Sequence, residues 1–203
     1  MSKIKGKDQI KSYLKKYGSS GVDFFQLKND GDTATVRFLH GSDEDLTLAL
    51  VHEVEIDGKK KYVECLEEDC PFCTAYGRPK LKLFLFVYDV SDEKVKMWER
   101  GPSMVDHILG FIDKYGEFNN RNYEIKRHGK KGDTQTTYQL FPDDKGPLLD
   151  SKGKEMDLPE RPKLYGRFVT QMDADKMAEF VQENEPVDRD KEQKNKAKSG
   201  PGF

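Results

Sequence analysis

The chain has 203 residues, of which 35% are hydrophobic and 11% aromatic, with 35 Lys and Arg against 37 Asp and Glu. This length allows one domain of ordinary size with a small addition, and the aromatic content is too high for a disordered chain. The longest apolar run, residues 83–88, is far shorter than the roughly 20 residues that span a membrane, and no apolar signal region follows the first residues. Membrane integration and secretion are therefore not expected.

Charged residues are segregated along the chain, although the net charge is only -2. Residues 1–17 carry six lysines against one aspartate, and residues 43–69 carry ten acidic residues against three lysines. Residues 121–131 are basic again, with five Lys and Arg against one glutamate. A nucleic acid would therefore have to bind at a local basic surface, with a strong dependence on salt.

The hydrophobic pattern predicts a series of strands with a few helices. Apolar residues spaced three and four apart predict an amphipathic helix over 7–17. β-Branched residues predict a strand over 33–40, and a hairpin follows from 46–56 and 61–63 with its turn at Asp57-Gly58. The later predicted elements are a strand over 80–88, a helix over 105–115, strands over 121–127 and 134–141, a loop over 142–162 and a helix over 173–184.

The strand over 80–88 alternates between two kinds of side chain. Its leucines and Val87 are expected to face a core, and the opposite face combines cations with aromatic rings: Lys80, Lys82, Phe84, Phe86 and Tyr88. The alternative is a central strand buried on both faces, with the two lysines at its exposed end. The strand over 33–40 likewise directs Val36 and Phe38 to the core and Arg37 to the other face.

These elements favour a mainly β (α+β) fold. We expect an OB-fold, a five-stranded antiparallel barrel, with a zinc-bound hairpin or knuckle insertion and short flanking helices. In this interpretation residues 1–20 are a basic N-terminal helix or arm, and residues 21–185 are the OB-fold domain, with the zinc subdomain at about 46–79. Residues 186–203 are a charged, low-complexity tail that we expect to be disordered.

A possible metal site follows from the spacing of one histidine and three cysteines. His52, Cys65, Cys70 and Cys73 form the pattern H-x12-C-x4-C-x2-C. Four nitrogen and sulfur ligands are typical of a closed tetrahedral zinc site, and thiolates and imidazole suit zinc better than hard cations. The simpler alternative is three buried thiols and an unrelated histidine. Three cysteines within nine residues of an acidic, turn-rich region favour the structural zinc site.

Two catalytic interpretations of the cysteines are less favoured. Cys70 and Cys73 resemble the redox pair of glutaredoxins, but such a pair normally follows the first strand of a βαβ unit, and here it follows a hairpin. Zinc deaminases combine H-x-E with P-C-x-x-C, whereas Val54 and Asp69 occupy the corresponding positions here. With four protein ligands, zinc would have no open position for an activated water, so we expect no enzymatic activity.

Basic and aromatic residues on the predicted strands suggest a surface for single-stranded nucleic acid, which is bound by basic grooves with stacking rings. The lysines and rings of 80–88 begin this surface. Residues on neighbouring strands and loops could extend it: Arg37, Tyr62, Tyr76, Arg78, Trp98, Arg121, Tyr123, Lys126, Arg127, Lys130 and Tyr138. Because residues 43–69 are acidic, only the Tyr62 or Tyr76 side of the zinc hairpin is expected to reach the groove.

Four features taken together resemble a known family. They are the strand motif Thr35-Val-Arg-Phe-Leu39, the ligand set ending in Cys70-Pro-Phe-Cys73, the aromatic-rich strand over 80–88, and the helix over 105–115 before a basic strand. On these residues, within about 24–141, the chain resembles the zinc-containing single-stranded DNA-binding (helix-destabilising) proteins of tailed bacteriophages. It departs from that family in its C-terminal tail, which is charge-balanced and ends in Phe203 instead of being strongly acidic.

The resemblance implies a function as well as a fold. It implies an OB-fold, a structural zinc ion, and cooperative, largely sequence-independent coating of single-stranded DNA during phage replication, recombination and repair. It also implies location in the bacterial host cytoplasm and contacts with phage replication proteins (a polymerase, helicase or loader) or with further copies of the chain. Two alternatives are a thiol-disulfide oxidoreductase using Cys70 and Cys73 and a zinc-stabilised protein-interaction adaptor.

Overall fold

The computed structural model describes residues 23–56, 59–133 and 135–184 of the chain. The predicted N-terminal helix and the charged tail lie outside these described residues. Within them the chain forms two compact units. Unit 1 contains residues 23–47 and 84–162, and unit 2 contains residues 48–83 and 163–184. Unit 2 is therefore built from two segments that are far apart in the sequence.

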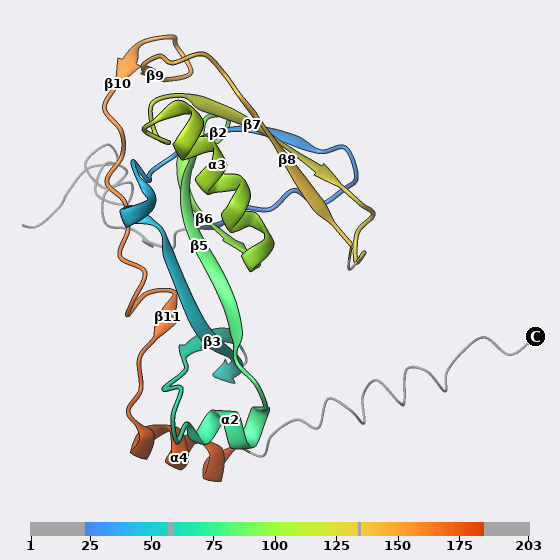
Figure 1. The fold of residues 1–203 in the computed structure, drawn as a ribbon, viewed down its shortest axis with the longest axis vertical. Coiled ribbons are helices and arrows are strands. Elements are labelled where there is room, and N and C mark those ends of the chain that lie inside the picture. Colours follow the sequence, from blue (N-terminus) through green and yellow to red (C-terminus); the bar gives the residue numbers. More distant parts are fainter. Residues whose placement is uncertain (1–22, 57–58, 134, 185–203) are drawn as a thin grey trace, which may run out of the picture. The chain divides into compact units, whose positions relative to one another are not determined.

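Unit 1 is organised around four antiparallel strands in the order β5-β2-β7-β8 (Figure 1). Tyr123 pairs with Val36, and Leu140 pairs with Ile125, so β2, β7 and β8 share one buried face. The strands are β2 (Thr33–Phe38), β5 (Lys80–Asp89, of which residues 84–89 belong to unit 1), β7 (Asn122–His128) and β8 (Thr137–Pro142).

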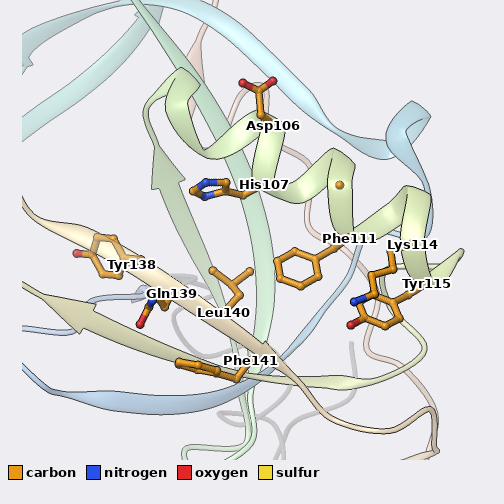
Figure 2. A pocket seen from close by; sticks show the side chains of 10 residues that line it. Asp106, His107, Phe111, Lys114, Tyr115, Tyr138, Gln139, Leu140 and Phe141 are labelled. Atoms are coloured by element: carbon orange, nitrogen blue, oxygen red, sulfur yellow. The ribbon is translucent and has the colours of Figure 1, made fainter.

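The remaining elements of unit 1 extend this sheet and cover it. Strand β6 (Lys94–Arg100) pairs with β5 and, in parallel, with β1 (Asp23–Phe24). Helix α3 (Val105–Tyr115) directs Phe111 toward Leu140 of β8, as Figure 2 shows. The short elements are two 3-10 turns, η1 (Asp43–Asp45) and η2 (Pro102–Met104), and the antiparallel pair β9 (Leu148–Leu149) and β10 (Glu155–Met156).

The core of unit 1 is rich in aromatic rings. The ring of Phe38 stacks on Phe118 with 4.2 Å between centroids and meets the edge of Tyr123 at 5.2 Å. The ring of Trp98 makes edge contacts with Phe25 at 5.7 Å and with Tyr138 at 5.5 Å. Aromatic pairs of this geometry add to the free energy gained by burying apolar area, so they compensate for the low hydrophobic content of the chain.

The face predicted to be open on β5 is buried. All residues from Leu83 to Asp89 are buried, because β5 lies inside the sheet and both of its faces are covered. The imidazole of His40 stacks 6.3 Å from the ring of Phe86, and its Nε2 accepts a hydrogen bond of 2.8 Å from the Phe86 backbone N–H. The alternative of a strand buried on both faces is therefore the correct one for this part of β5.

Unit 2 contains strands β11-β4-β3 and two helices that lie side by side (Figure 1). Its core contains Val63, Phe72 and Met177, all fully buried. Asp173 caps α4 by accepting a hydrogen bond of 2.9 Å from the backbone N–H of Lys176. The elements are β3 (Thr47–Ile56), β4 (Lys59–Glu64), β11 (Val169–Thr170), α2 (Pro71–Tyr76) and α4 (Ala174–Glu183).

The expected OB-fold barrel is not what the structure shows. The fold is mainly β with a few short helices, and its sheet is mixed because β1 pairs with β6, and β11 with β4, in parallel. Among the described strands no closed barrel forms, since β8 pairs only with β7 and leaves its outer edge open. No helix within the described ranges is long and apolar enough to cross a membrane.

Candidate metal centre and candidate nucleic-acid interface

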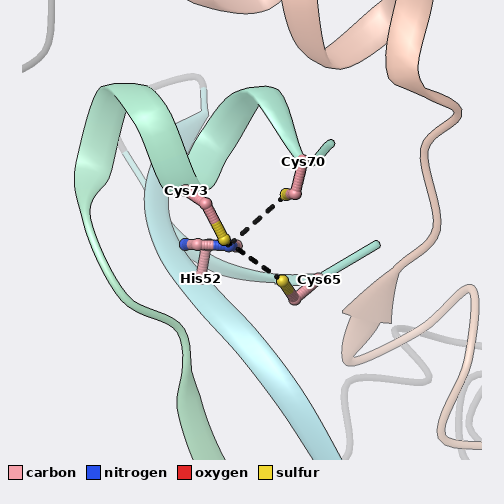
Figure 3. Close-up of side chains that lie close together, drawn as sticks. All are labelled: His52, Cys65, Cys70 and Cys73. Carbon is pink, nitrogen blue, oxygen red and sulfur yellow. Dashed lines mark hydrogen bonds between the residues drawn. The ribbon is translucent and has the colours of Figure 1, made fainter. Parts of the chain in front are cut away.

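Four side chains predicted as metal ligands lie together in unit 2 (Figure 3). His52 comes from β3, and Cys65 directly follows β4, where its backbone N–H donates a 2.8 Å hydrogen bond to the carbonyl of Leu50. Cys70 is the N-cap of α2, and Cys73 lies in its first turn. The hairpin therefore supplies two donors, and the short helix that follows it supplies the other two.

The distances between the donor atoms fit tetrahedral coordination. The four atoms lie within 4.8 Å of one another, with Sγ of Cys65 3.5 Å from Sγ of Cys73. Nε2 of His52 is 3.6 Å from Sγ of Cys70 and 3.6 Å from Sγ of Cys73. Metal–ligand bonds of about 2.0 to 2.3 Å, arranged tetrahedrally, place sulfur atoms about 3.8 Å apart and sulfur and nitrogen about 3.6 Å apart. The four donors could therefore bind a metal ion.

Backbone N–H groups point at the thiols. The N–H of Glu67 donates to Sγ of Cys65 at 3.3 Å, and the positive φ angles of Glu67 (64°) and Asp69 (50°) turn the chain back toward Cys70. Burial acts to raise the pKa of Cys70, but backbone hydrogen bonds from Leu66, Cys73 and Phe72 outweigh it and lower that pKa. Donors of this kind stabilise a thiolate, which is the form that binds a metal.

The other donors are held in an apolar environment. Burial lowers the pKa of His52, so its imidazole is neutral at pH 7 and keeps a lone pair for a metal. Burial, followed by the neighbouring thiols, raises the pKa of Cys73 to about 12. Three thiols at this spacing cannot all ionise without a cation among them, and a bound divalent cation would supply that charge.

The metal cluster belongs to the core of unit 2. Phe72 lies between Cys70 and Cys73 in the sequence, and its ring meets the ring of His52 edge-on at 5.8 Å and the ring of Phe180 at 5.5 Å. Only 3% of Cys70 is exposed, and Met177 of α4 covers it. Such burial is unfavourable for a thiol that must attack an external disulfide, which is normally partly exposed.

Seven of the residues predicted to contact DNA are buried, and this corrects their assignment to an open face. At most 9% of each is exposed, so neither base stacking nor phosphate contact is available to them in this conformation. They are Arg37, Phe84, Phe86, Tyr88, Trp98, Tyr123 and Arg127. The aromatic members fill the core of unit 1, and the two arginines have a structural role described next.

Arg37 and Arg127 tie loops to the sheet. Nε of Arg37 donates to Oδ1 of Asn122 at 2.8 Å, and its two terminal nitrogens donate at 3.1 Å to three backbone carbonyls, those of Asn119, Gly146 and Pro147. Arg127 donates to the carbonyls of Leu27, Gly129 and Lys130, to Oγ1 of Thr136 and to the hydroxyl of Tyr138. Alternation places Arg37 opposite the core, as predicted, but a loop covers that face.

The remaining predicted residues are at least partly exposed and fall into two groups. In unit 2, Nζ of Lys80 lies 3.2 Å from Oε1 of Glu53, and Nζ of Lys82 lies 3.8 Å from the same oxygen. The carboxylate of Glu53 therefore offsets part of their positive charge. Tyr62 and Tyr76 are half-buried there, and Arg78 is exposed. In unit 1, Lys126 lies on β7 and Lys130 in the loop that follows, Tyr138 of β8 points to the opposite face of the sheet from Lys126, and Arg121 precedes β7. Among the described residues, Lys126 and Lys130 of the unit 1 group form no ion pair.

Three further aromatic residues of unit 1 were not predicted. Phe111 and Tyr115 lie on α3, and Phe141 lies on β8 with 45% of its area exposed. The spacing of Phe111 and Tyr115, four residues apart, places both rings on one face of the helix and could have identified them. For Phe141, strand alternation could have identified an exposed ring, because the neighbouring Leu140 points to the core.

Comparisons with models of protein families and with curated protein sequences find no match to this chain. The donor set in unit 2 and the basic and aromatic surface of unit 1 are therefore the features from which a function can be argued.

Proposed function

We propose that this chain binds single-stranded DNA with little sequence preference and carries a structural zinc ion in unit 2. The observation that carries the DNA-binding proposal is the set of lysines without an ion pair on the β7–β8 hairpin, next to the exposed ring of Phe141. Lys126, Lys130 and Lys131 form no ion pair with any described residue. Basic side chains beside aromatic rings are typical of proteins that bind single strands.

The register of the hairpin places these groups on one face. Lys126 is the partner of Gln139, and Glu124 is the partner of Phe141, so the four side chains lie on the same side of the sheet. Lys130 and Lys131 extend the positive charge into the exposed loop at the end of the hairpin. A phosphate backbone that follows the hairpin would meet Lys126, Lys130 and Lys131, while Glu124 and Asp133 are the acidic residues of the same segment.

Zinc is the proposed metal because of the donor set. One imidazole and three thiols are soft ligands, and their spacing supports tetrahedral coordination, which zinc adopts in structural sites. Four protein donors leave no position for a reactive water, so the proposed metal stabilises unit 2 and has no catalytic role. Roles in phage replication, recombination and repair, and contacts with a polymerase, helicase, loader or further copies of the chain, belong to the same proposal.

The test is a titration of the purified, metal-assayed protein with fluorescent oligo-dT at two salt concentrations. We expect about one zinc per chain and an affinity that falls steeply with salt, at about 0.7 log units of affinity per log unit of salt for each phosphate neutralised. A duplex of the same length should bind more weakly. Saturable, tight binding of duplex with little affinity for single strands would contradict the proposal.

A pair of double variants locates the surface. Lys130→Gln with Lys131→Gln should reduce the salt slope by about 1.4, because two phosphate contacts are lost. Lys152→Gln with Lys154→Gln is the matched control, since these exposed lysines belong to the β9–β10 segment of unit 1. Zinc-loaded protein without nucleic-acid affinity would indicate the adaptor alternative. Metal-free protein with a redox-active Cys70 and Cys73 would indicate the oxidoreductase.

A further inference from the structure

The outer edge of strand β8 runs along a groove beside helix α3 in unit 1 (Figure 2). The groove has a volume of about 490 Å³, and the consecutive residues 138–141 of β8 all line it. Successive side chains of a strand point to opposite faces of its sheet, so a groove lined by all of them follows the edge of the strand. Among the described strands β8 pairs only with β7, which leaves this edge open. The groove therefore lies where a further strand could be added.

The hydrogen-bond pattern shows which backbone groups of β8 point out of the sheet. The N–H of Asp143 donates to the carbonyl of Asn122 at 2.9 Å, which continues the ladder between β8 and β7. Hydrogen-bonded pairs alternate with non-bonded pairs in an antiparallel ladder, so the N–H and C=O groups of Tyr138 and Leu140 point to the open edge. The same follows from Arg127, the register partner of Tyr138, whose N–H and C=O bond to the residues that precede β2.

Both sides of this edge offer apolar surface. On the side of α3, Phe111 points toward Leu140 across the groove, and a Cβ atom on Gly110 of the groove lining would face open space. On the opposite face of the sheet, Phe141 has 45% of its area exposed. An added strand alternates its own side chains in the same way, so aliphatic residues at its centre would contact apolar surface on both faces.

Arginine side chains lie at both ends of the open edge. The guanidinium of Arg100 lies 4.3 Å from the ring centroid of Tyr138, near the start of β8. At the other end, Nη1 of Arg121 donates to the carbonyl of Asp143 at 3.4 Å. Neither arginine forms an ion pair with a described residue, and Asp106 is the acidic side chain of the groove lining. The ends of the edge therefore favour acidic groups in a partner.

We propose that a short extended segment of another protein, aliphatic at its centre and acidic at both ends, adds to β8 as a further strand. Its backbone pairs with Tyr138 and Leu140, and its central side chain enters the groove beside α3. Its acidic ends meet Arg100 and Arg121. Pro142 has no N–H, so the pairing ends there. The DNA-binding proposal concerns lysines on β7 and in the hairpin loop, so this inference goes beyond it and does not depend on it.

The groove fits such a peptide better than a nucleic acid or a second copy of the chain. Guanidinium groups already lie over the rings of Tyr115 and Tyr138, at 4.4 and 4.3 Å, where a base would have to stack. Outward N–H and C=O groups instead match the backbone of a peptide. Two copies joined at this edge would bring their arginines together, which is unfavourable. The basic residues 1–17 of the same chain are disfavoured for the same reason.

The first test measures the affinity of the full-length, metal-loaded chain for a fluorescein-labelled peptide, Glu-Glu-Val-Leu-Val-Glu-Glu. Gly110→Leu places a side chain in the groove, and it should not weaken α3, because leucine favours a helix more than glycine does. Gly110→Ala is the matched control, since a methyl group is too small to fill the groove. Lys130→Gln with Lys131→Gln tests whether the peptide binds the proposed DNA surface instead. Emission from Trp98 and the thermal midpoint check that each variant folds.

The second test concerns the backbone of the peptide. One version is N-methylated at its valines, and another at the leucine and the glutamates next to the valines. An added strand turns alternate N–H groups toward β8, so one of these versions should lose binding and the other should keep it. Attraction between charges alone would not distinguish the two versions.

We expect Gly110→Leu to weaken peptide binding by about tenfold or more, because it excludes the central side chain from the groove. Gly110→Ala and the double lysine variant should bind the peptide as the wild type does. The proposal fails if the wild type binds no peptide, if Gly110→Leu binds it as tightly as the wild type, or if the two methylated versions bind alike. If Gly110→Leu loses affinity for oligo-dT and keeps it for the peptide, the groove is a nucleic-acid site, so this inference fails while the proposed function stands.

Discussion

The thioether sulfur of Met177 lies 3.9 Å from the thiol of Cys70, although 107 residues separate the two in the sequence. Both side chains are buried in unit 2, where Phe72 and Phe180 complete the contact between α2 and α4. The candidate metal centre and the C-terminal helix therefore share one hydrophobic core. A change in either should affect the stability of the other.

Met177→Ala should lower the free energy of unfolding of unit 2 by about 2 to 5 kcal/mol, because it leaves a cavity beside the metal ligands. The same variant should release its metal faster to a chromophoric chelator. Denaturant unfolding followed by hydrogen exchange in α4, together with the rate of metal transfer, measures both effects. Glu179→Ala, at an exposed position on α4, is the control. Unchanged metal release from a destabilised Met177→Ala protein would contradict the shared core.

Arg37→Lys should destabilise unit 1 by about 3 kcal/mol and leave DNA affinity per folded molecule unchanged. Lysine cannot reproduce the fork of donors that reaches Asn122 and three carbonyls, and the carbonyls would be left without partners inside the protein. Chemical denaturation gives the first quantity, and an oligo-dT titration at low temperature gives the second. A weakened affinity at full stability would instead place Arg37 in contact with DNA.

Much of the fold could be predicted from local patterns. The hairpin of β3 and β4, the strands β2, β5, β7 and β8 and the helices α3 and α4 lie where the spacing of apolar residues and the turn residues placed them. The four donors of the metal cluster were also found from spacing alone, and the structure confirms that they lie together. Local periodicity and ligand spacing are properties of short stretches, so they can be read without tertiary contacts.

Burial by distant segments could not be predicted in the same way. Alternation correctly separates Arg37 from Val36, but it does not reveal that the loop containing Gly146 and Pro147 covers Arg37. The six-residue helix α2 is too short to show a helical period, and β6 contains charged residues on both sides of Met97 and Trp98. The membership of α4 in unit 2 depends on contacts across more than half of the chain.

The stability of unit 1 should fall as the pH is lowered from about 6.5 to about 4. Burial, with a contribution from Arg161, lowers the pKa of His40 from 6.5 to about 4. The backbone N–H of Phe86 donates to its Nε2, so Nδ1 carries the proton and donates to the carbonyl of Asp45 at 3.0 Å. Protonation of Nε2 would break the first bond and place a second cation beside Arg161, whose Nη1 lies 3.2 Å from Nδ1.

The sign follows from proton binding. Between the two pKa values the unfolded chain binds a proton that the folded chain does not, so the free energy of unfolding rises with pH, by about 3 kcal/mol over the whole interval. In His40→Gln this part of the pH dependence should disappear, leaving the contribution of carboxylates such as Asp45. Denaturant unfolding at pH 7, 5.5 and 4 measures it. An unchanged pH profile in His40→Gln would contradict the prediction.

Tyr123→Phe should raise the free energy of unfolding by about 1 kcal/mol. The hydroxyl of Tyr123 is buried and has no hydrogen-bond partner among the described residues, and burial raises its pKa to about 12. Removal of an unsatisfied polar group from an apolar site is favourable, and the ring contacts with Phe38, Phe111 and Phe118 remain. Thermal and denaturant unfolding measure the change. A destabilised variant would show that the hydroxyl has a partner outside these residues.

Because unit 2 is built from two segments that are far apart in the sequence, its parts are synthesised at different times. All four metal donors are made by residue 73, but α4, which covers Phe72 and Cys70, is made about a hundred residues later. At about 5 to 20 residues per second, the donors wait roughly 5 to 20 s for that cover. During this interval metal can bind, while Phe72 stays accessible to chaperones or to other nascent chains. A chain whose synthesis ends prematurely within residues 84–162 would therefore contain all four metal donors but lack α4, so its apolar face around Phe72 would stay uncovered.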